Sequence, residues 1–396
     1  MNMNAFEYYT PTRVVFGMDA EERAGELCKA FGAKKVLIHY GGGSAVRSGL
    51  IERVKASLNA SGLQHAELSG VVPNPELSKV YEGIELAKRE GVDFILAVGG
   101  GSVIDSSKAI AYGLANPEND VWDFYLKKAV PKAAYPVGAI LTIAAAGSEM
   151  SNSSVITNEK TGEKRGCNHD ICRCKFAIMN PELTKTLPDY QTEAGCADIM
   201  MHTMERYFTG KGNMELTDAL AEGLLKTVMR NAELLHKEPE NIEARAEVMW
   251  ASSLSHNGLT GCGNGGDDFA SHRIEHELSG MFGVTHGAGL CAVWPSWARY
   301  VHKDCLDRFV EFALNVMGVE KAASDEETAL LGIEAMEDFY HRIGMPVSLR
   351  ELIGKELSED EIKTLAANCE RAVGGHIGSA KLLGRADFEE IYRMAI

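Results

Sequence analysis

The pattern of apolar positions changes near residue 187 of the chain. Before that point, short apolar runs rich in β-branched residues alternate with amphipathic segments. The apolar runs are residues 34–40, 93–98, 134–143, 153–158 and 174–180, and the amphipathic segments are residues 50–62 and 77–91. This alternation predicts βαβ units that build a parallel sheet.

After Pro188 the apolar positions recur at helical spacing. The segments concerned are residues 198–210, 215–235, 243–258, 327–344 and 360–373. Strand-like runs are absent from this half of the sequence. We therefore expect an α/β domain with a dinucleotide-binding, Rossmann-like sheet at residues 1–187, followed by an all-helical domain at residues 188–396.

Length, charge and cysteine spacing narrow the class of protein. A chain of 396 residues is long enough for two hydrophobic cores. Its 56 acidic and 40 basic residues give a net charge of −16, which disfavours nucleic acid as a partner. The start of the chain lacks a basic segment followed by an apolar run, and the longest apolar stretch falls far short of the roughly 20 residues that span a bilayer. The nine cysteines are scattered rather than densely paired. We expect a cytoplasmic protein with reduced thiols and no membrane partner.

Two strand-to-helix junctions carry three glycines followed by a serine. They are Gly41-Gly42-Gly43-Ser44 and Gly99-Gly100-Gly101-Ser102. Each places backbone N–H groups at a helix start with no side chain in the way, which suits phosphate oxygens. Neither is a G-x-G-x-x-G fingerprint, and a glycine-rich turn can also be only a tight turn. Asp105 and Lys108 follow the second junction, either as part of the cofactor site or as an ion pair on a helix surface.

Acidic and imidazole side chains gather in two segments of the helical half. Asp198 and His202 are four residues apart and project from one helix face. His272, His276 and His286 follow within fifteen residues. One carboxylate with three imidazoles suits divalent iron or zinc and leaves a position for substrate. One histidine is spare: spacing alone pairs His272 with His276 but excludes no other choice, and capping or core histidines are the alternative.

A third cluster contains Cys167, Cys172 and Cys174, with His169 between them. It lacks the paired C-x2-C spacing of structural zinc sites. The cluster can therefore be interpreted either as a metal-binding knot or as ordinary loop and strand cysteines.

Ordered motifs along nearly the whole chain resemble those of a known family. They are PTRVVFG, KVLIHYGGGSAVRSG, the stretch from GVVPNPELSK to AVGGGSVIDSSKAIA, GSEM, GCADIMMHTMERY and HRIEHELSGMFGVTHGAGL. The chain resembles the iron-containing, or group III, alcohol dehydrogenases, with the greatest similarity to their butanol dehydrogenase branch. Their fold is shared with glycerol dehydrogenase and dehydroquinate synthase. The resemblance implies a homodimeric, NAD(P)(H)-dependent alcohol dehydrogenase or aldehyde reductase for small primary alcohols and aldehydes, with one Fe²⁺ or Zn²⁺ ion.

The resemblance also implies roles for individual residues. Asp198, His202, His272 and His286 match the family's metal ligands, which leaves His276 beside the reacting centre as the catalytic residue. The cofactor-binding positions are Gly99 to Ser102 at the pyrophosphate, Thr142 along the cofactor, Lys164 near the ribose, and Gly41 to Ser44 around the adenosine ribose. Departures are Ala145 and Ala146, where a small hydroxyl residue is often found, and Phe269, where a tryptophan is common. The cysteine-rich stretch matches no family hallmark.

Three other functions compete with this interpretation. A dehydroquinate synthase-like lyase would need Lys and Arg around the metal to hold a carboxylate and a phosphate, whereas the metal-bearing segments are rich in Met and Phe. A glycerol dehydrogenase-like enzyme shares the same fold. A non-catalytic nucleotide-binding protein would not need Asp198 and His276.

The first glycine turn bears on the choice between NAD(H) and NADP(H). Enzymes that select NAD often place an acid just after the second strand, to accept the ribose 2′-OH. Here no acid follows before Glu52, while Ser44 and Arg47 offer donors to a phosphate. A permissive turn would accept both cofactors. We expect NADPH to be accepted.

Overall fold

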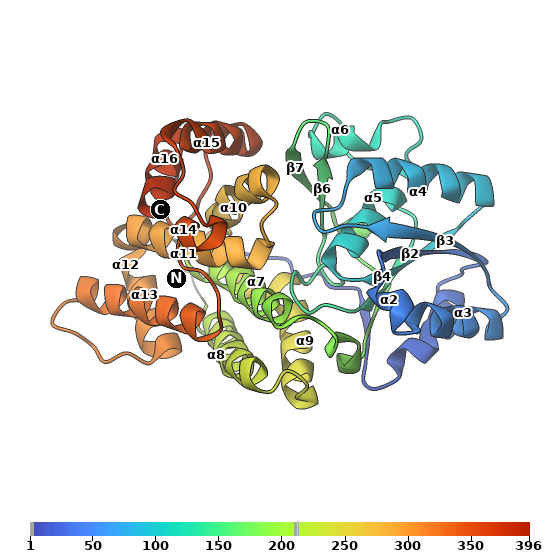
Figure 1. Cartoon of the computed structure of the whole chain (residues 1–396), viewed down its shortest axis with the longest axis horizontal. Coiled ribbons are helices and arrows are strands. Elements are labelled where there is room, and N and C mark those ends of the chain that lie inside the picture. The colour runs from blue at the N-terminus through green and yellow to red at the C-terminus, as the bar shows by residue number, and fades with distance from the viewer. Residues whose placement is uncertain (1–3, 210–211, 213) are drawn as a thin grey trace. The chain divides into compact units, whose positions relative to one another are not determined.

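The computed structural model describes residues 4–209, 212 and 214–396 (Figure 1). The chain divides between Thr186 and Leu187 into two compact units. Residues 4–8, which we expected in the α/β domain, group with the helical unit instead. The reason is that the Asn4 side-chain amide donates hydrogen bonds to the carbonyl oxygens of Gly263, at 3.5 Å, and Asn264, at 3.0 Å.

A six-stranded parallel sheet forms the centre of the α/β unit. Its strands lie in the order β1 (Arg13–Phe16), β8 (Phe176–Met179), β5 (Val137–Leu141), β4 (Phe94–Gly99), β2 (Lys35–Gly41) and β3 (Gln64–Val71). The central strands are buried on both faces, as expected of a parallel sheet covered by helices. This confirms the predicted Rossmann-like fold class.

Helices cover both faces of the sheet. Alternate strand residues such as Val36, Ile38 and Leu96 pack in one apolar cluster with α1 (Ala24–Ala30) and α3 (Leu50–Ala60). On α4 (Leu77–Glu90), a Cβ on Gly83 would overlap Ile110 of α5 (Gly101–Ala115). The lack of a side chain at Gly83 therefore lets these two helices pack closely.

Two strands of this unit escaped prediction because their sequences are polar. The edge strand β3 reads QHAELSGV, and β7 (Glu163–Asn168) reads EKRGCN. β7 pairs antiparallel with β6 (Ser153–Asn158) in a hairpin apart from the parallel sheet. A polar strand on a two-stranded hairpin buries too little apolar surface to leave a period-2 signal.

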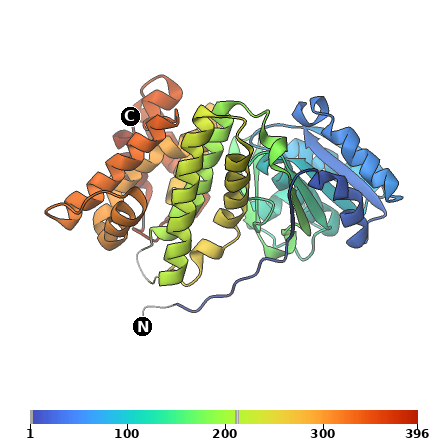
Figure 2. The ribbon, with the colours of Figure 1, turned by 90° about the horizontal axis from the view of Figure 1, so that it is seen from below.

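The second unit is all-helical, as predicted. Its helices are α7 (Asp189–Tyr207), α8 (Glu215–Lys237), α9 (Ile242–His256), α10 (Ala270–Phe282), α11 (His286–Val301), α12 (Leu306–Phe312), α13 (Asp325–Arg342), α14 (Leu349–Ile353), α15 (Glu359–Val373) and α16 (Arg385–Met394). Figure 2 shows α8 running alongside its neighbours α7 and α9. α7 begins nine residues before the helix expected at 198–210, whose last residue lies outside the described residues. Within the described chain, no helix combines the length and the apolar character that a membrane span requires.

Candidate metal centre and glycine turns

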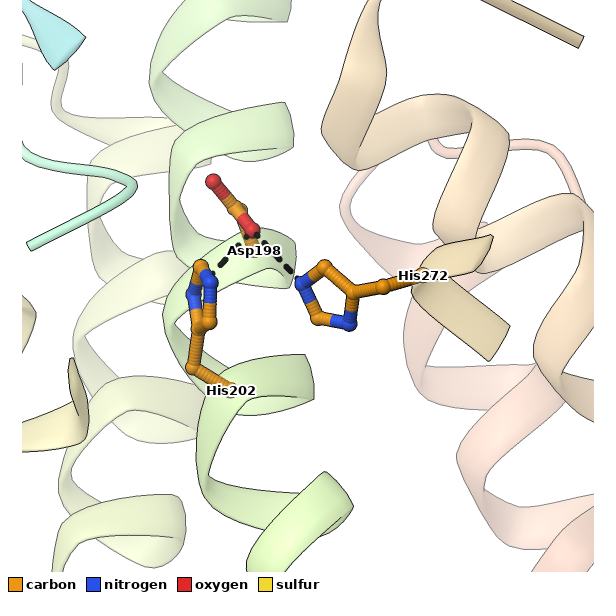
Figure 3. A group of neighbouring side chains, drawn as sticks. All are labelled: Asp198, His202 and His272. Carbon is orange, nitrogen blue, oxygen red and sulfur yellow. Dashed lines mark ion pairs between the residues drawn. The ribbon is translucent and has the colours of Figure 1, made fainter. Parts of the chain in front are cut away.

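Three helices bring one carboxylate and three imidazoles together in the helical unit. Figure 3 shows Asp198 of α7 between His202, one turn further along α7, and His272 of α10. Asp198 Oδ1 lies 3.2 Å from His202 Nδ1, 3.7 Å from His272 Nε2 and 3.8 Å from His286 Nε2. His286 is the first residue of α11. The three imidazoles thus converge on a single carboxylate oxygen.

Close packing of α11 on α7 makes this convergence possible. Gly287 follows His286, and a Cβ at Gly287 would overlap the carbonyl oxygen of Ala194 on α7. A residue with any side chain at this position would push the two helices apart. The glycine therefore keeps His286 within reach of Asp198.

The buried polar atoms of this group fit a divalent cation. Asp198, His202 and His272 are between 4% and 5% exposed. Within the described chain, Asp198 Oδ1, His202 Nδ1 and His272 Nε2 have no hydrogen-bond partner. Leaving such atoms unsatisfied is costly, whereas a metal ion between them would satisfy all three. The N₃O donor set, with His286 as the third nitrogen, suits iron or zinc.

Electrostatics favour the metal-binding protonation states of Asp198 and His202. Burial opposes ionisation of Asp198, but the imidazoles of His202, His286 and His272 outweigh it and hold the pKa of Asp198 below its usual value. Burial also keeps the pKa of His202 well below its usual range. Burial lowers the pKa of His272 as well, but Asp198 and Glu205 together raise it above the usual value. An ionised Asp198 beside a neutral His202 is the form in which these groups act as ligands.

Two further carboxylates orient the imidazoles. Glu205 Oε1 accepts a hydrogen bond from His272 Nδ1 at 2.8 Å, and Glu275 Oε2 pairs with His286 Nδ1. Both glutamates are almost completely buried. Because each occupies Nδ1, the Nε2 atoms of His272 and His286 are directed at Asp198, which is the usual arrangement around metal-bound histidines. The sequence analysis missed both; the only signal was an acid three residues after His202 and another three after His272.

His276 lies next to this group. It is 7% exposed, its ring centroid is 5.5 Å from that of His286, and its Nδ1 is 3.5 Å from Arg273 Nη1. The ligand atoms of His276, Glu275 and His286 lie within 4.8 Å of one another. All four predicted histidines therefore belong to one region of the helical unit.

A further imidazole and a guanidinium pack behind His202. The ring of His256 is centred 4.0 Å from that of His202. Arg206 donates to the carbonyl oxygens of His202 and Ser255, and its guanidinium lies 5.0 Å from the ring centroid of Phe269. Phe269 has a left-handed backbone with φ 54°, and its ring is centred 6.4 Å from that of His202 and 6.1 Å from that of His256. None of these contacts was predictable from spacing.

In the α/β unit, the second glycine turn lies against the segment after β5. Thr142 N donates to the carbonyl oxygen of Gly99 at 3.1 Å. A Cβ on Gly100 would come within 3.0 Å of Ile143, and one on Gly101 within 3.1 Å of Ala146. Side chains at Gly100 and Gly101 would therefore crowd those of Ile143 and Ala146. The structure thus brings together Thr142 and the Gly99–Ser102 turn, two of the expected cofactor positions.

The other expected cofactor positions lie on three elements. Gly41–Ser44 connects β2 to the short helix α2 (Ser44–Arg47), and β2 and β4 are neighbours, so both glycine turns lie at the carboxyl edge of the sheet. Lys164 is buried on β7 opposite Thr157. Both carboxylate oxygens of Asp105, on α5, accept hydrogen bonds from neighbouring protein groups.

Comparison with known proteins covers both units. The model of the iron-containing alcohol dehydrogenases matches residues 11–181, and that of the C-terminal part of the Fe-containing alcohol dehydrogenase family matches residues 192–396. The chain belongs to the iron-containing alcohol dehydrogenase family. Family membership confirms the expected enzyme class, an alcohol dehydrogenase.

Several members of the iron-containing alcohol dehydrogenase family match almost end to end. NADH-dependent butanol dehydrogenase A of Clostridium acetobutylicum is 40% identical over 99% of both chains. The NADPH-dependent aldehyde reductase YqhD of Escherichia coli is 35% identical over 88% of this chain and 89% of its own. The crystal structure of NADH-dependent butanol dehydrogenase A from Thermotoga maritima superposes with a TM-score of 0.95 at 40% identity, covering 100% of this chain and 99% of that one.

The cysteine cluster lies in the α/β unit, outside the candidate metal centre. Cys167, Cys172 and Cys174 are buried free thiols. Among the described residues, they do not combine with His169 into a group of three atoms close enough to hold a metal. The cysteines are therefore ordinary buried residues of the α/β unit, and the metal-knot alternative is not supported.

Proposed function

We propose that this chain is an NAD(P)(H)-dependent enzyme that interconverts small primary alcohols and aldehydes, such as butanol and butanal, with one divalent metal ion held by Asp198, His202, His272 and His286. The observation that carries the proposal is the convergence of three imidazole nitrogens on one buried oxygen of Asp198. The names of the relatives, NADH-dependent butanol dehydrogenase and NADPH-dependent aldehyde reductase, support the substrate class and the nicotinamide cofactor.

The chain's own residues would hold the ion and move the proton. When bound, a divalent ion supplies Lewis-acid polarisation of the alcohol or aldehyde oxygen. Glu205 and Glu275 keep His272 and His286 in the tautomer that leaves Nε2 free for the ion. His276, next to His286 but bonded through Nδ1 to Arg273, is proposed to pass the proton between substrate and solvent. A bound nicotinamide cofactor would supply the hydride donor or acceptor.

We propose Fe²⁺ or Zn²⁺ as the ion, because a donor set of one carboxylate and three imidazoles binds both. The experiment is to strip the enzyme of metal, reload it anaerobically with Fe²⁺, Zn²⁺ or Mg²⁺, and follow NADH and NADPH oxidation with butanal. We expect Fe²⁺ or Zn²⁺ to restore turnover and Mg²⁺, which prefers oxygen ligands, to fail. Full turnover by the metal-free enzyme would refute the proposal.

For the cofactor, we propose that Gly99 to Ser102 and Thr142 bind the pyrophosphate side, and that Gly41 to Ser44 and Lys164 surround the ribose. The support is the contact between Thr142 and Gly99, and the place of both glycine turns at one edge of the sheet. We further propose that both NADH and NADPH are accepted. Arg47 Nη1 lies 2.6 Å from the position of a Cβ built on Gly43, so its guanidinium lies at the turn proposed for the ribose, where it would pair with a 2′-phosphate.

We also propose a cytoplasmic homodimer. β1 is an edge strand that, among the described residues, pairs only with β8, and the large side chains of Tyr9, Phe16 and Met18 around it are 43% to 53% exposed. An edge of this kind favours pairing with a second copy. Light scattering of the parent and of Phe16→Lys tests the dimer: we expect the parent to have twice the chain mass and the variant to dissociate. A monomeric parent would contradict it.

Nine buried free thiols support a reducing location.

A further inference from the structure

A buried lysine fastens the segment between β5 and β6 to helix α5. Lys108 is 0% exposed, and its ammonium donates to four oxygen atoms. They are the carbonyl oxygens of Ser148 at 2.7 Å, Ser151 at 3.0 Å and Ser153 at 2.8 Å, and the hydroxyl of Ser148 at 3.2 Å. The surface ion pair that the sequence left open for this residue is therefore wrong.

Asp105, one turn earlier on α5, holds the same segment. Its Oδ1 accepts a hydrogen bond from the Ser148 hydroxyl at 2.5 Å, and its Oδ2 accepts one from Val155 N at 2.9 Å. Its backbone carbonyl accepts from the Ser154 hydroxyl at 2.8 Å. Two charged side chains on successive turns thus bind residues 148–155 at several points.

The strength of this attachment follows from its burial. An ammonium taken out of water is costly unless oxygen atoms replace its hydration shell, and here four of them do. Charge-assisted hydrogen bonds of this kind are stronger than neutral ones and are weakened little by salt when buried. Removing Lys108 would leave three carbonyl oxygens without their donor. The arrangement resembles the oxygen cage of a monovalent cation.

The attachment links the two stretches that we proposed for the cofactor. α5 begins at Gly101, within the pyrophosphate turn, and Thr142 at the start of the other stretch bonds to Gly99. Lys108 and Asp105 fix the far end of that stretch to the same helix. One helix therefore sets the spacing between the Gly99–Ser102 turn and residues 142–155.

We propose that Lys108 and Asp105 are positioning residues for the nicotinamide cofactor, which hold the segment of residues 142–155 at the distance from α5 that cofactor binding requires. Neither residue contacts the cofactor in this role, because their polar atoms are bonded to the segment itself. The inference rests on the proposed function for the identity of the ligand.

The decisive variant is Lys108→Ala, studied in the full-length, metal-loaded enzyme. We expect its dissociation constant for NADH or NADPH, measured by nicotinamide fluorescence, to rise about tenfold or more. The KM for the cofactor should rise with it, while kcat at saturating cofactor and the KM for butanal stay within about twofold. Bound metal should be unchanged, since the metal ligands lie in the other unit. Ser107→Ala is the matched control. Ser107 is buried on the same helix, and among the described residues its hydroxyl donates only to the carbonyl oxygen of Val103 within α5. The cofactor affinity of this variant should equal that of the parent.

Chemical rescue separates positioning from a general loss of structure. Lys108→Ala leaves a space for a small alkylammonium ion within the same oxygen atoms. Propylammonium chloride should restore much of the cofactor affinity, whereas tetramethylammonium chloride at equal ionic strength cannot donate hydrogen bonds and should not. Equal rescue by both salts, or rescue by neither in a folded variant, would overturn the proposal.

A milder variant keeps the test decisive if Lys108→Ala does not fold. Ser148→Ala removes one bond each to Asp105 and Lys108 and should raise the dissociation constant about threefold; an unchanged constant would overturn the proposal. A parent enzyme that binds neither NADH nor NADPH refutes the proposed function, and the inference with it. A parent that binds and a folded Lys108→Ala that binds equally well refute the inference alone.

Discussion

At the scale of single residues, some side chains of the candidate metal centre face Asp198 and others lie beside these. His272 and His286 each present Nε2 to Asp198, with Nδ1 held by a glutamate. The ring of His276 is centred 5.5 Å from that of His286, and in the proposed function His276 transfers the proton. The difference leads to a test on purified variants.

We predict that His272→Ala and His286→Ala lose tightly bound metal, because each deletes one of four protein ligands. His276→Ala should keep its metal but turn over at least about a hundredfold more slowly, as expected when a general acid is removed. Elemental analysis beside kcat provides the readout. A metal-free His276→Ala with a fully loaded His286→Ala would reverse the ligand assignment.

Cofactor selectivity can also be tested at the scale of single residues, since the relatives divide between NADH and NADPH. We predict that Gly42→Asp lowers the ratio of kcat/KM for NADPH over NADH. The new carboxylate would repel a 2′-phosphate and accept a bond from a free 2′-OH. The substitution is sterically open, because a Cβ on Gly42 meets no atom within 4 Å.

Gly42→Asn is the control for this change, since it has the same size without the charge and should move the ratio much less. If the parent does not use NADPH at all, or if the ratio of kcat/KM is unchanged in Gly42→Asp, the Gly41–Ser44 turn does not discriminate between a 2′-OH and a 2′-phosphate on the ribose.

How far single residues could be predicted depends on what sets their role. Asp198 and His202 share a helix face, so spacing alone paired them, but the choice among His272, His276 and His286 needed the family resemblance. Glu205 and Glu275 were missed because an acid on a helix most often faces solvent. Their burial depends on packing between helices, which no local pattern records.

At the scale of elements, the approach of α11 to α7 is the feature on which the site depends. We predict that Gly287→Ala destabilises the helical unit by about 1–3 kcal/mol or more and weakens metal binding, because its Cβ overlaps the Ala194 carbonyl oxygen and must separate the two helices. Urea unfolding and metal content measure the two effects.

Gly223→Ala provides the matched control on α8, where a new Cβ meets no atom within 4 Å. This change should stabilise the protein by roughly 0.5–1 kcal/mol, as is usual for Gly to Ala in a helix. If both variants were equally stable and equally loaded with metal, helix separation would not control the site.

Elements were predictable where burial imposes a period. The strands β2 and β4 are buried on both faces and appear as continuous apolar runs, while β3 and β7 are polar and were not found. The first half of α7 was missed for a related reason: residues 189–193 read DYQTE, a polar start whose helical state is fixed by packing further along the helix.

At the scale of the whole molecule, all proposed metal ligands belong to the helical unit. We predict that a chelator accelerates amide hydrogen exchange in α7, α10 and α11, because the ion would stabilise only the folded form of these helices. Exchange in β2 and β4 should not change. Mass spectrometry with peptide resolution measures exchange in both sets of elements. Loss of protection in the sheet instead of in the helices would contradict a metal site in the helical unit.

The division of the chain also bears on the order in which it folds during synthesis. Residues 9–186 are continuous, so the α/β unit has all of its own sequence before the helical unit has been translated. The hydrogen bonds of the Asn4 side chain form later, because their acceptors are the carbonyl oxygens of Gly263 and Asn264 in the helical unit. Asn4 therefore forms these hydrogen bonds only after a loop of about 260 residues has closed, when the α/β unit already has all of its own sequence.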